Sequence, residues 1–147
     1  MITAGTTLIN MQANTIYKIL DPGANGDYPG ECNSLCVLQS APGQPIHITG
    51  WVKTEEGGVD VLTITDGNNS AAPVYTYDGY AYVDVTGYSS YVKINFESNL
   101  QLSYEGYCLT AQVVCDYQPE VFNVALHSLG SQEVTLTWED HSLDSEW

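Results

Sequence analysis

The chain contains 147 residues and has a formal net charge of −15, because 18 Asp and Glu residues outnumber 3 Lys and Arg residues. This charge repels phosphate backbones and anionic lipids, so the sequence excludes nucleic acid as a partner. No apolar run of about 18 residues occurs, and we therefore expect no membrane span. The length suits one domain with a sizeable core, and any second unit is expected to be partial.

Alternation of apolar and polar residues predicts the strands. In chain order, the alternating apolar positions are Ile46 and Ile48; Leu62 and Ile64; Val83 and Val85; Val92, Ile94 and Phe96; and Leu109, Ala111 and Val113. Turn-forming sequences such as Asp21-Pro22-Gly23 and Asn25-Gly26 separate these segments. The sequence contains no clear helical stripe. It predicts an all-β fold, a sandwich of antiparallel strands with little or no helix.

The alternation restarts after Pro119, where Val134, Leu136 and Trp138 occupy one strand face. Two strands alone bury too little apolar area to be stable in water. We therefore expect residues 1–117 to form the main domain. Residues 118–147 are expected to be a linker and a short β segment that packs on another surface, belongs to a truncated domain or pairs with a neighbouring molecule.

The four cysteines are Cys32, Cys36, Cys108 and Cys115. An even number in a β-rich acidic chain predicts two disulfide bonds and an oxidising, extracellular compartment. A four-thiolate zinc site is the alternative, but the C-x3-C and C-x6-C spacings differ from those of short zinc knuckles. Cys108 and Cys115 lie an odd number of residues apart, so on a regular strand they face opposite sides and are not expected to pair with each other.

The sequence contains many tyrosines in its middle third, namely Tyr75, Tyr77, Tyr80, Tyr82, Tyr88 and Tyr91. They predict either a stacking platform for sugar rings or half-buried strand residues whose hydroxyl groups reach water, and the second arrangement is the more common.

Catalytic motifs are missing from the sequence. The three histidines, His47, His127 and His141, do not occur in H-E-x-x-H or beside a G-x-S-x-G elbow. No Gly-rich phosphate loop precedes a helix. The sequence therefore predicts a protein that is not an enzyme.

Several short motifs occur in a fixed order between residues 15 and 116. They are DPGANGDYP at 21–29, CVLQSAP at 36–42, VDVLTITDG at 59–67, and FESN at 96–99 followed by Gly106-Tyr107. In this order they resemble a CUB domain of the kind found in exported bacterial proteins. The resemblance implies an antiparallel jelly-roll β-sandwich that is secreted or displayed at the cell surface.

The chain departs from the CUB pattern at three positions. Leu38 stands where the family has Trp, Gly58 replaces its second cysteine, and Asn99 replaces an Asp. If Cys36 lacks its usual partner, the disulfide pattern of the family does not carry over. We then expect two bonds between the Cys32/Cys36 segment and the last strand of the domain.

Many CUB domains bind calcium through acidic side chains at one end of the sandwich. The resemblance carries this site to Tyr28, Glu55 or Glu56, Asp60 and Asn99. Calcium binds about six to eight oxygen ligands, and Asn99 keeps an oxygen while removing one charge, which is expected to weaken binding. The alternative is that Asp60 bonds to the backbone of its turn while both glutamates are solvated. A second acidic loop, at 21–27, has partial EF-hand spacing and is predicted to be a turn.

The sequence thus predicts a non-catalytic extracellular interaction or adhesion module. Its protein or glycan ligand binds at the loop end with calcium as cofactor, and a lysine of the partner pairs with Glu56 and Asp60. The alternative is a structural subunit of an extracellular filament, in which the C-terminal segment mediates self-association through strand pairing. From Pro119 onwards this segment resembles the first two strands of a fibronectin type III domain, with Trp138 as the core tryptophan.

Overall fold

The computed structural model describes residues 6–24, 26–114, 123–129 and 133–139, and the side chains of the first two ranges. The chain divides into two compact units, Met1–Cys115 and Asp116–Trp147. The described ranges contain strands and turns but no helix, so the all-β prediction is confirmed. Accordingly, nothing described is a helix long and apolar enough to cross a membrane.

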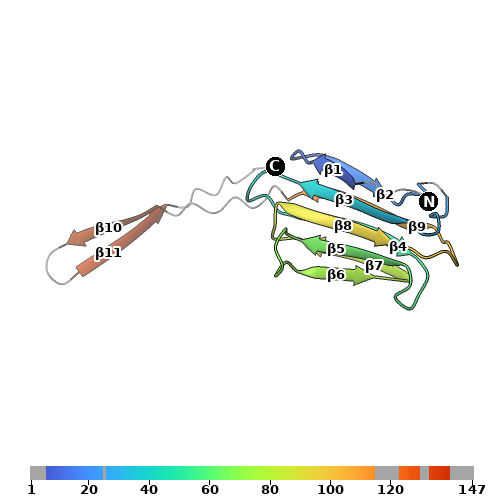
Figure 1. Cartoon of the computed structure of the whole chain (residues 1–147). Coiled ribbons are helices and arrows are strands. Elements are labelled where there is room, and N and C mark those ends of the chain that lie inside the picture. Colours follow the sequence, from blue (N-terminus) through green and yellow to red (C-terminus); the bar gives the residue numbers. More distant parts are fainter. Residues whose placement is uncertain (1–5, 25, 115–122, 130–132, 140–147) are drawn as a thin grey trace. The chain divides into compact units, whose positions relative to one another are not determined.

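The first unit consists of two sheets that lie face to face (Figure 1). The five-stranded sheet contains, in spatial order, β1 (Thr6–Asn10), β3 (Asn33–Gln39), β8 (Tyr91–Glu97), β5 (Val61–Asp66) and β6 (Val74–Tyr77). The four-stranded sheet contains β2 (Ile16–Leu20), β9 (Gly106–Val113), β4 (Ile46–Lys53) and β7 (Tyr80–Thr86). This arrangement is the predicted β-sandwich.

One strand pair differs from the antiparallel prediction. β1 pairs with β3 in parallel, with Leu8 opposite Val37. Between these strands the chain passes through β2, which belongs to the other sheet, and returns. The detour through the other sheet lets the chain re-enter this one in the same direction, as a parallel pair requires.

The core lies between the sheets and is built from the alternating positions. The buried residues include every predicted apolar position: Ile46, Ile48, Leu62, Ile64, Val83, Val85, Val92, Ile94, Phe96, Leu109, Ala111 and Val113. Leu38, which replaces the tryptophan of the CUB pattern, is also fully buried. Phe96 packs edge-on against Tyr28 and Tyr107, with ring centroids 5.1 and 5.5 Å apart. The period-two pattern therefore identified the core face of the strands.

The second unit contains a hairpin of β10 (Asn123–Leu129) and β11 (Glu133–Glu139). The antiparallel register places Val124 opposite Trp138 and Leu126 opposite Leu136. The two strands form a separate two-stranded sheet. Their assignment to a fibronectin type III domain stays a prediction.

Candidate functional site

Four loops meet at one end of the sandwich: residues 21–32, 54–60, 78–79 and 98–105, referred to below as the loop end. The strand register brings them together. In the four-stranded sheet the start of β9 lies beside the ends of β2 and β4, and in the five-stranded sheet the end of β8 lies beside the starts of β3 and β5. Backbone hydrogen bonds then join the first loop to the last. The Glu31 N–H donates to the Asn99 carbonyl at 2.7 Å, and the Tyr28 N–H donates to the Tyr104 carbonyl at 3.0 Å.

Asp60 ties three of these loops together from a fully buried position. Its Oδ2 accepts a 2.5 Å hydrogen bond from the Tyr28 hydroxyl, and its Oδ1 accepts a 2.8 Å bond from the Asn99 N–H. Asp60 therefore bonds across loops and does not merely close its own turn. A buried carboxylate needs such donors to compensate for the loss of water.

Thr54 adds a fourth loop to this network, and the sequence gave no reason to single it out. Its hydroxyl donates to the Asp60 carbonyl at 3.0 Å and accepts from the Gly79 N–H at 3.0 Å. Thr54 is itself buried. The loop end is consequently held by hydrogen bonds between segments far apart in sequence.

The Tyr28 side chain is the aromatic element of the network and is 1% exposed. Burial raises the pKa of its hydroxyl well above the ordinary value, and the hydrogen bond to Asp60 raises it further. Tyr28 is therefore a proton donor throughout the neutral range. The hydroxyl oxygen also accepts from the Glu55 N–H at 3.3 Å.

The remaining predicted ligands separate into two groups. Glu55 Oε2 accepts a 3.5 Å hydrogen bond from Asn99 Nδ2, whereas Asn99 Oδ1 accepts from the Gln101 N–H at 2.6 Å. Glu56 is exposed, and its side chain lies over Gly79. The structure thus links Tyr28, Glu55, Asp60 and Asn99 by hydrogen bonds and places Glu56 to one side.

The donor set of this cluster consists of oxygen atoms, which is the chemistry that calcium prefers. It offers two carboxylates, Glu55 and Asp60, with an amide and a phenol oxygen. Nowhere in the described ranges do three or more His, Cys, Asp or Glu side chains gather as a metal site. The residues fit a hard cation by donor type, and the calcium site stays a prediction.

One expected role of Asp60 is wrong. Its side chain is 0% exposed and is hydrogen-bonded to Tyr28 and Asn99, so it cannot pair with a lysine of a partner. The surface of the loop end carries other carboxylates, on the exposed residues Asp27, Glu31, Glu56, Asp78 and Glu105. Its four loops contain no Lys or Arg.

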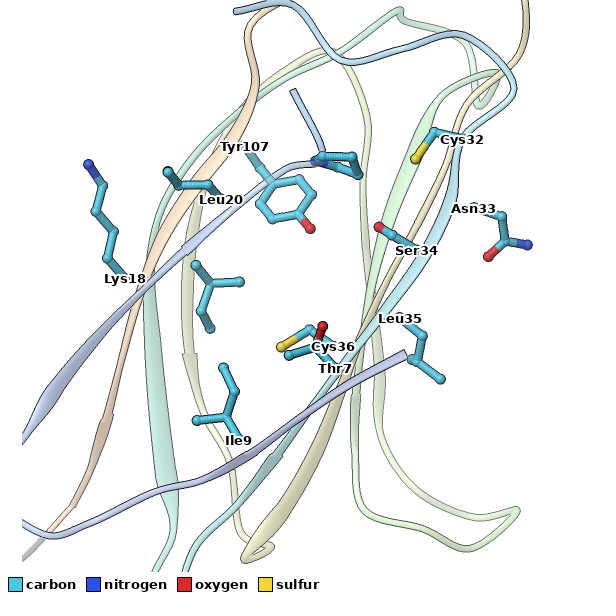
Figure 2. Close-up of a pocket in the computed structure, with 12 residues that line it drawn as sticks. Thr7, Ile9, Lys18, Leu20, Cys32, Asn33, Ser34, Leu35, Cys36 and Tyr107 are labelled. Carbon is cyan, nitrogen blue, oxygen red and sulfur yellow. The ribbon is translucent and has the colours of Figure 1, made fainter. Parts of the chain in front are cut away.

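The cysteines occupy two different environments. Cys32 and Cys36 line a cavity of about 400 Å³ together with residues of β1, β2 and Tyr107, and both sulfur atoms face this cavity (Figure 2). Burial raises the pKa of both thiols. Cys108 is exposed on the outer face of β9, where the neighbouring residues Tyr107 and Leu109 point inward.

The predicted disulfides are not present in the described part of the chain, because Cys32, Cys36 and Cys108 are free thiols. Cys108 cannot bond to the two inward-facing cysteines, since its side chain lies on the opposite face of its sheet. Cys115 lies outside the described residues. The expectation that Cys108 and Cys115 face opposite sides therefore stays a prediction.

The acidic loop that begins at Asp21 forms a turn, as expected. The Gly23 N–H donates to Asp21 Oδ1 at 2.6 Å, and the Ala24 N–H donates to the Asp21 carbonyl at 3.0 Å. Burial raises the pKa of the Asp21 carboxyl group. These bonds close an Asx-type turn.

Comparisons with known proteins identify the class of fold. No protein-family model matches the chain, and no curated protein matches it. Among solved structures, the CUB1-EGF-CUB2 region of human MASP-1/3 is similar with a TM-score of 0.64 and 18% identity, over 74% of this chain and 41% of that one. A MASP-1 CUB2 domain described as bound to Ca2+ is similar with a TM-score of 0.63 and 17% identity, over 75% of this chain and 99% of that one.

The rat MASP-1 CUB1-EGF-CUB2 structure gives a TM-score of 0.60 and 15% identity, over 85% of this chain and 51% of that one. The chain therefore spans about half or less of the two multidomain structures and nearly all of the single domain. The first unit has a CUB-like fold.

Proposed function

We propose that the CUB-like unit is an extracellular, non-catalytic interaction module whose loop end binds a cationic protein partner. The observation that carries this proposal is that the four loops of the loop end present exposed carboxylates and contain no Lys or Arg; Lys53, which ends β4 beside them, is paired with Glu105 at 2.6 Å. The buried network around Asp60 supports it, because a network that fixes four loops preorganises the surface they present.

Apolar residues accompany the carboxylates at the loop end. Val59, Leu100 and Leu102 are 42, 70 and 52% exposed. A partner with lysine or arginine side chains beside apolar ones matches this surface in both charge and polarity. The net charge of −15 would also accelerate the association of a cationic partner with this chain.

Calcium is part of the proposal as a stabiliser of the loops. Glu55, Asp60, Asn99 and Tyr28 would hold the ion, and the ion would supply positive charge between the two carboxylates. The similarity to a CUB domain described as bound to Ca2+ supports this assignment. The loss of one carboxylate at Asn99 implies a weak site.

Thermal unfolding in calcium and in chelator tests the ion. At a calcium concentration 100-fold above the dissociation constant, binding contributes about 2.7 kcal/mol. We expect calcium to raise the midpoint of the wild type and of Glu56→Gln, and to have a much smaller effect on Glu55→Gln. Equal responses of the two variants, or no response of the wild type, would contradict the site.

Binding of a fluorescent lysine-rich peptide tests the partner surface at physiological salt. We expect a triple variant of the loop end, Asp27→Asn with Glu31→Gln and Glu56→Gln, to bind about tenfold more weakly, or about 1.4 kcal/mol. The matched control changes Asp140, Asp144 and Glu146 in the C-terminal segment and has the same net charge. Equal weakening by both variants would show that only the total charge matters.

A structural role in a filament is the second candidate, and the register of the hairpin favours it. Val124 pairs with Trp138 and Leu126 with Leu136, which gathers apolar residues on two strands that need a further surface for stability. Light scattering over a range of concentrations tests this role. We expect assembly of the intact chain and a monomer after Trp138→Ser; a monomer in both cases would contradict a filament.

A further inference from the structure

The outer face of the four-stranded sheet carries a cluster of exposed aromatic side chains. Outward-facing positions alternate along each strand, and the register aligns them in rows. One row contains Cys108, Trp51 and Tyr82, and the next contains Lys53 and Tyr80. We call Trp51, Tyr80 and Tyr82 the aromatic shelf.

The rings of the aromatic shelf support one another. Trp51 stacks on Tyr80 with centroids 5.3 Å apart and planes 21° apart, and it meets Tyr82 edge-on at 4.7 Å. Despite these contacts, Trp51, Tyr80 and Tyr82 are 52, 70 and 51% exposed. A ligand would therefore meet rings that are already oriented and would lose little side-chain entropy on binding them.

A polar hollow lies beside the shelf on the same face. It has a volume of about 190 Å³ and is lined by Ile16, His47, Thr49, Thr110, Ala111 and Gln112. Two pairs of hydrogen-bonding groups lie in or beside it: the Thr49 and Thr110 hydroxyl groups are 2.9 Å apart, and Nε2 of His47 is 2.9 Å from Oδ1 of Asp84, which lies just outside the hollow.

The shelf and the hollow follow one another along β4. Thr49 precedes Trp51 by two residues, so both side chains point outward in successive rows. From Lys53 to His47 the face extends roughly 20 Å at about 3.3 Å per residue. This distance accommodates several linked sugar rings, one of them in the hollow.

We propose that this face binds an uncharged polysaccharide, with pyranose rings stacked on the aromatic shelf and hydroxyl groups bonded in the polar hollow. The C–H face of a pyranose ring is apolar and suits an aromatic surface, while its rim of hydroxyl groups both donates and accepts. The hydroxyl groups of Thr49 and Thr110 and the carboxylate of Asp84 supply the matching partners.

The charge of the chain favours an uncharged glycan. This face carries Asp84 and Glu105 together with Lys18, which lies opposite Thr110, and Lys53, so it is nearly balanced, while the net charge of −15 repels sulfated and uronic-acid polymers. Lys53 on this face is already 2.6 Å from Glu105. The site is separate from the loop-end network, and the proposal does not depend on calcium.

Cys108 provides an independent reporter of occupancy. It is exposed and lies directly opposite Trp51 in the register. A polysaccharide on the shelf would shield its thiol from alkylation. Cys36, which faces the interior cavity, would not be shielded in the same way.

Affinity electrophoresis through gels containing glucan, mannan or xylan tests the proposal, with dextran sulfate as the anionic comparison. We expect retardation by at least one uncharged polymer, a loss of affinity of about tenfold or more in Trp51→Ala, and partial retention in Trp51→Phe. Tyr88→Ala is the matched control, because Tyr88 is 88% exposed but lies on the turn before β8. Retarding polymers should also slow alkylation of Cys108 selectively.

Three results would overturn the proposal. The first is no retardation of the wild type by any uncharged polymer. The second is equal loss in Trp51→Ala and Tyr88→Ala. The third is a concentration-dependent dimer that Trp51→Ala dissociates, because the shelf would then be an interface between two copies of the chain.

Discussion

Replacing either partner of the Tyr28–Asp60 hydrogen bond should lower the free energy of unfolding by a measurable amount. Tyr28→Phe removes only the hydroxyl and leaves the ring against Phe96, so the packing is preserved. Hydrogen bonds to charged groups contribute about 1.5–3 kcal/mol. We therefore expect Tyr28→Phe to lower the free energy of unfolding by about 2 kcal/mol.

Asp60→Ala should cost more, because it leaves two donors without their acceptor. The Tyr28 hydroxyl and the Asn99 N–H both lose their partner inside the protein. Each unpaired buried group costs about 1–3 kcal/mol, so the two together cost about 2–6 kcal/mol.

Urea denaturation of the two single variants and the double variant measures the coupling between them. Because Tyr28→Phe and Asp60→Ala remove the same bond, we expect the double variant to be less destabilised than the sum by about 1.5–3 kcal/mol. A coupling energy below about 0.5 kcal/mol, as found for independent sites, would refute the role assigned to this bond.

Further changes test other features of the structure. Asn99→Asp adds the carboxylate that the CUB pattern has at this position, so calcium should raise the unfolding midpoint more than in the wild type, as measured by calorimetry. Alkylation followed by mass spectrometry should modify Cys108 at least roughly tenfold faster than Cys32 and Cys36, because burial raises the pKa of both inner thiols; equal rates in the native state would contradict their burial. Burial raises the pKa of Tyr107 from 10.0 to about 12. The associated stability is present below pH 10 and is lost as the pH rises towards 12, so Tyr107→Phe should flatten the decline in urea midpoint above pH 10. Gly50→Ala should destabilise by more than about 3 kcal/mol in the same assay, since at a φ of 151° its methyl group would collide with the Cys108 carbonyl, whereas Gly57→Ala meets open space and should cost about 1 kcal/mol.

The sequence predicted the architecture because the fold depends on a pattern that is local. Ile46 and Ile48 are separated by the polar His47, and Leu62 and Ile64 by Thr63, and this alternation is enough to assign the buried face of a strand. The parallel pairing of β1 with β3 was not predictable in this way. It depends on which sheet β2 joins, and no local pattern encodes that choice.

The candidate site was predicted only in part for the same reason. The order of the motifs predicted that Tyr28, Asp60 and Asn99 belong to one site, and the structure links them through hydrogen bonds. Glu55 and Glu56 are adjacent and chemically equivalent in sequence, and only the path of the loop separates them. Thr54 was overlooked because a threonine at a strand end is ordinary until its two partners, from separate loops, are known.

The end of β4 shows how one strand serves two surfaces without conflict. Trp51 and Lys53 point outward to the aromatic shelf, whereas Val52 and Thr54 are buried, and Thr54 supports the loop end from inside. Successive side chains on a strand face opposite sides, so the residues proposed to contact a glycan are not those that hold the loops. Substitutions at Trp51 can therefore change recognition while the hydrogen bonds around Asp60 are retained. The loop end and the outer face of the sheet are thus built from opposite sides of the same strand, and the ion pair between Lys53 and Glu105 is where they meet.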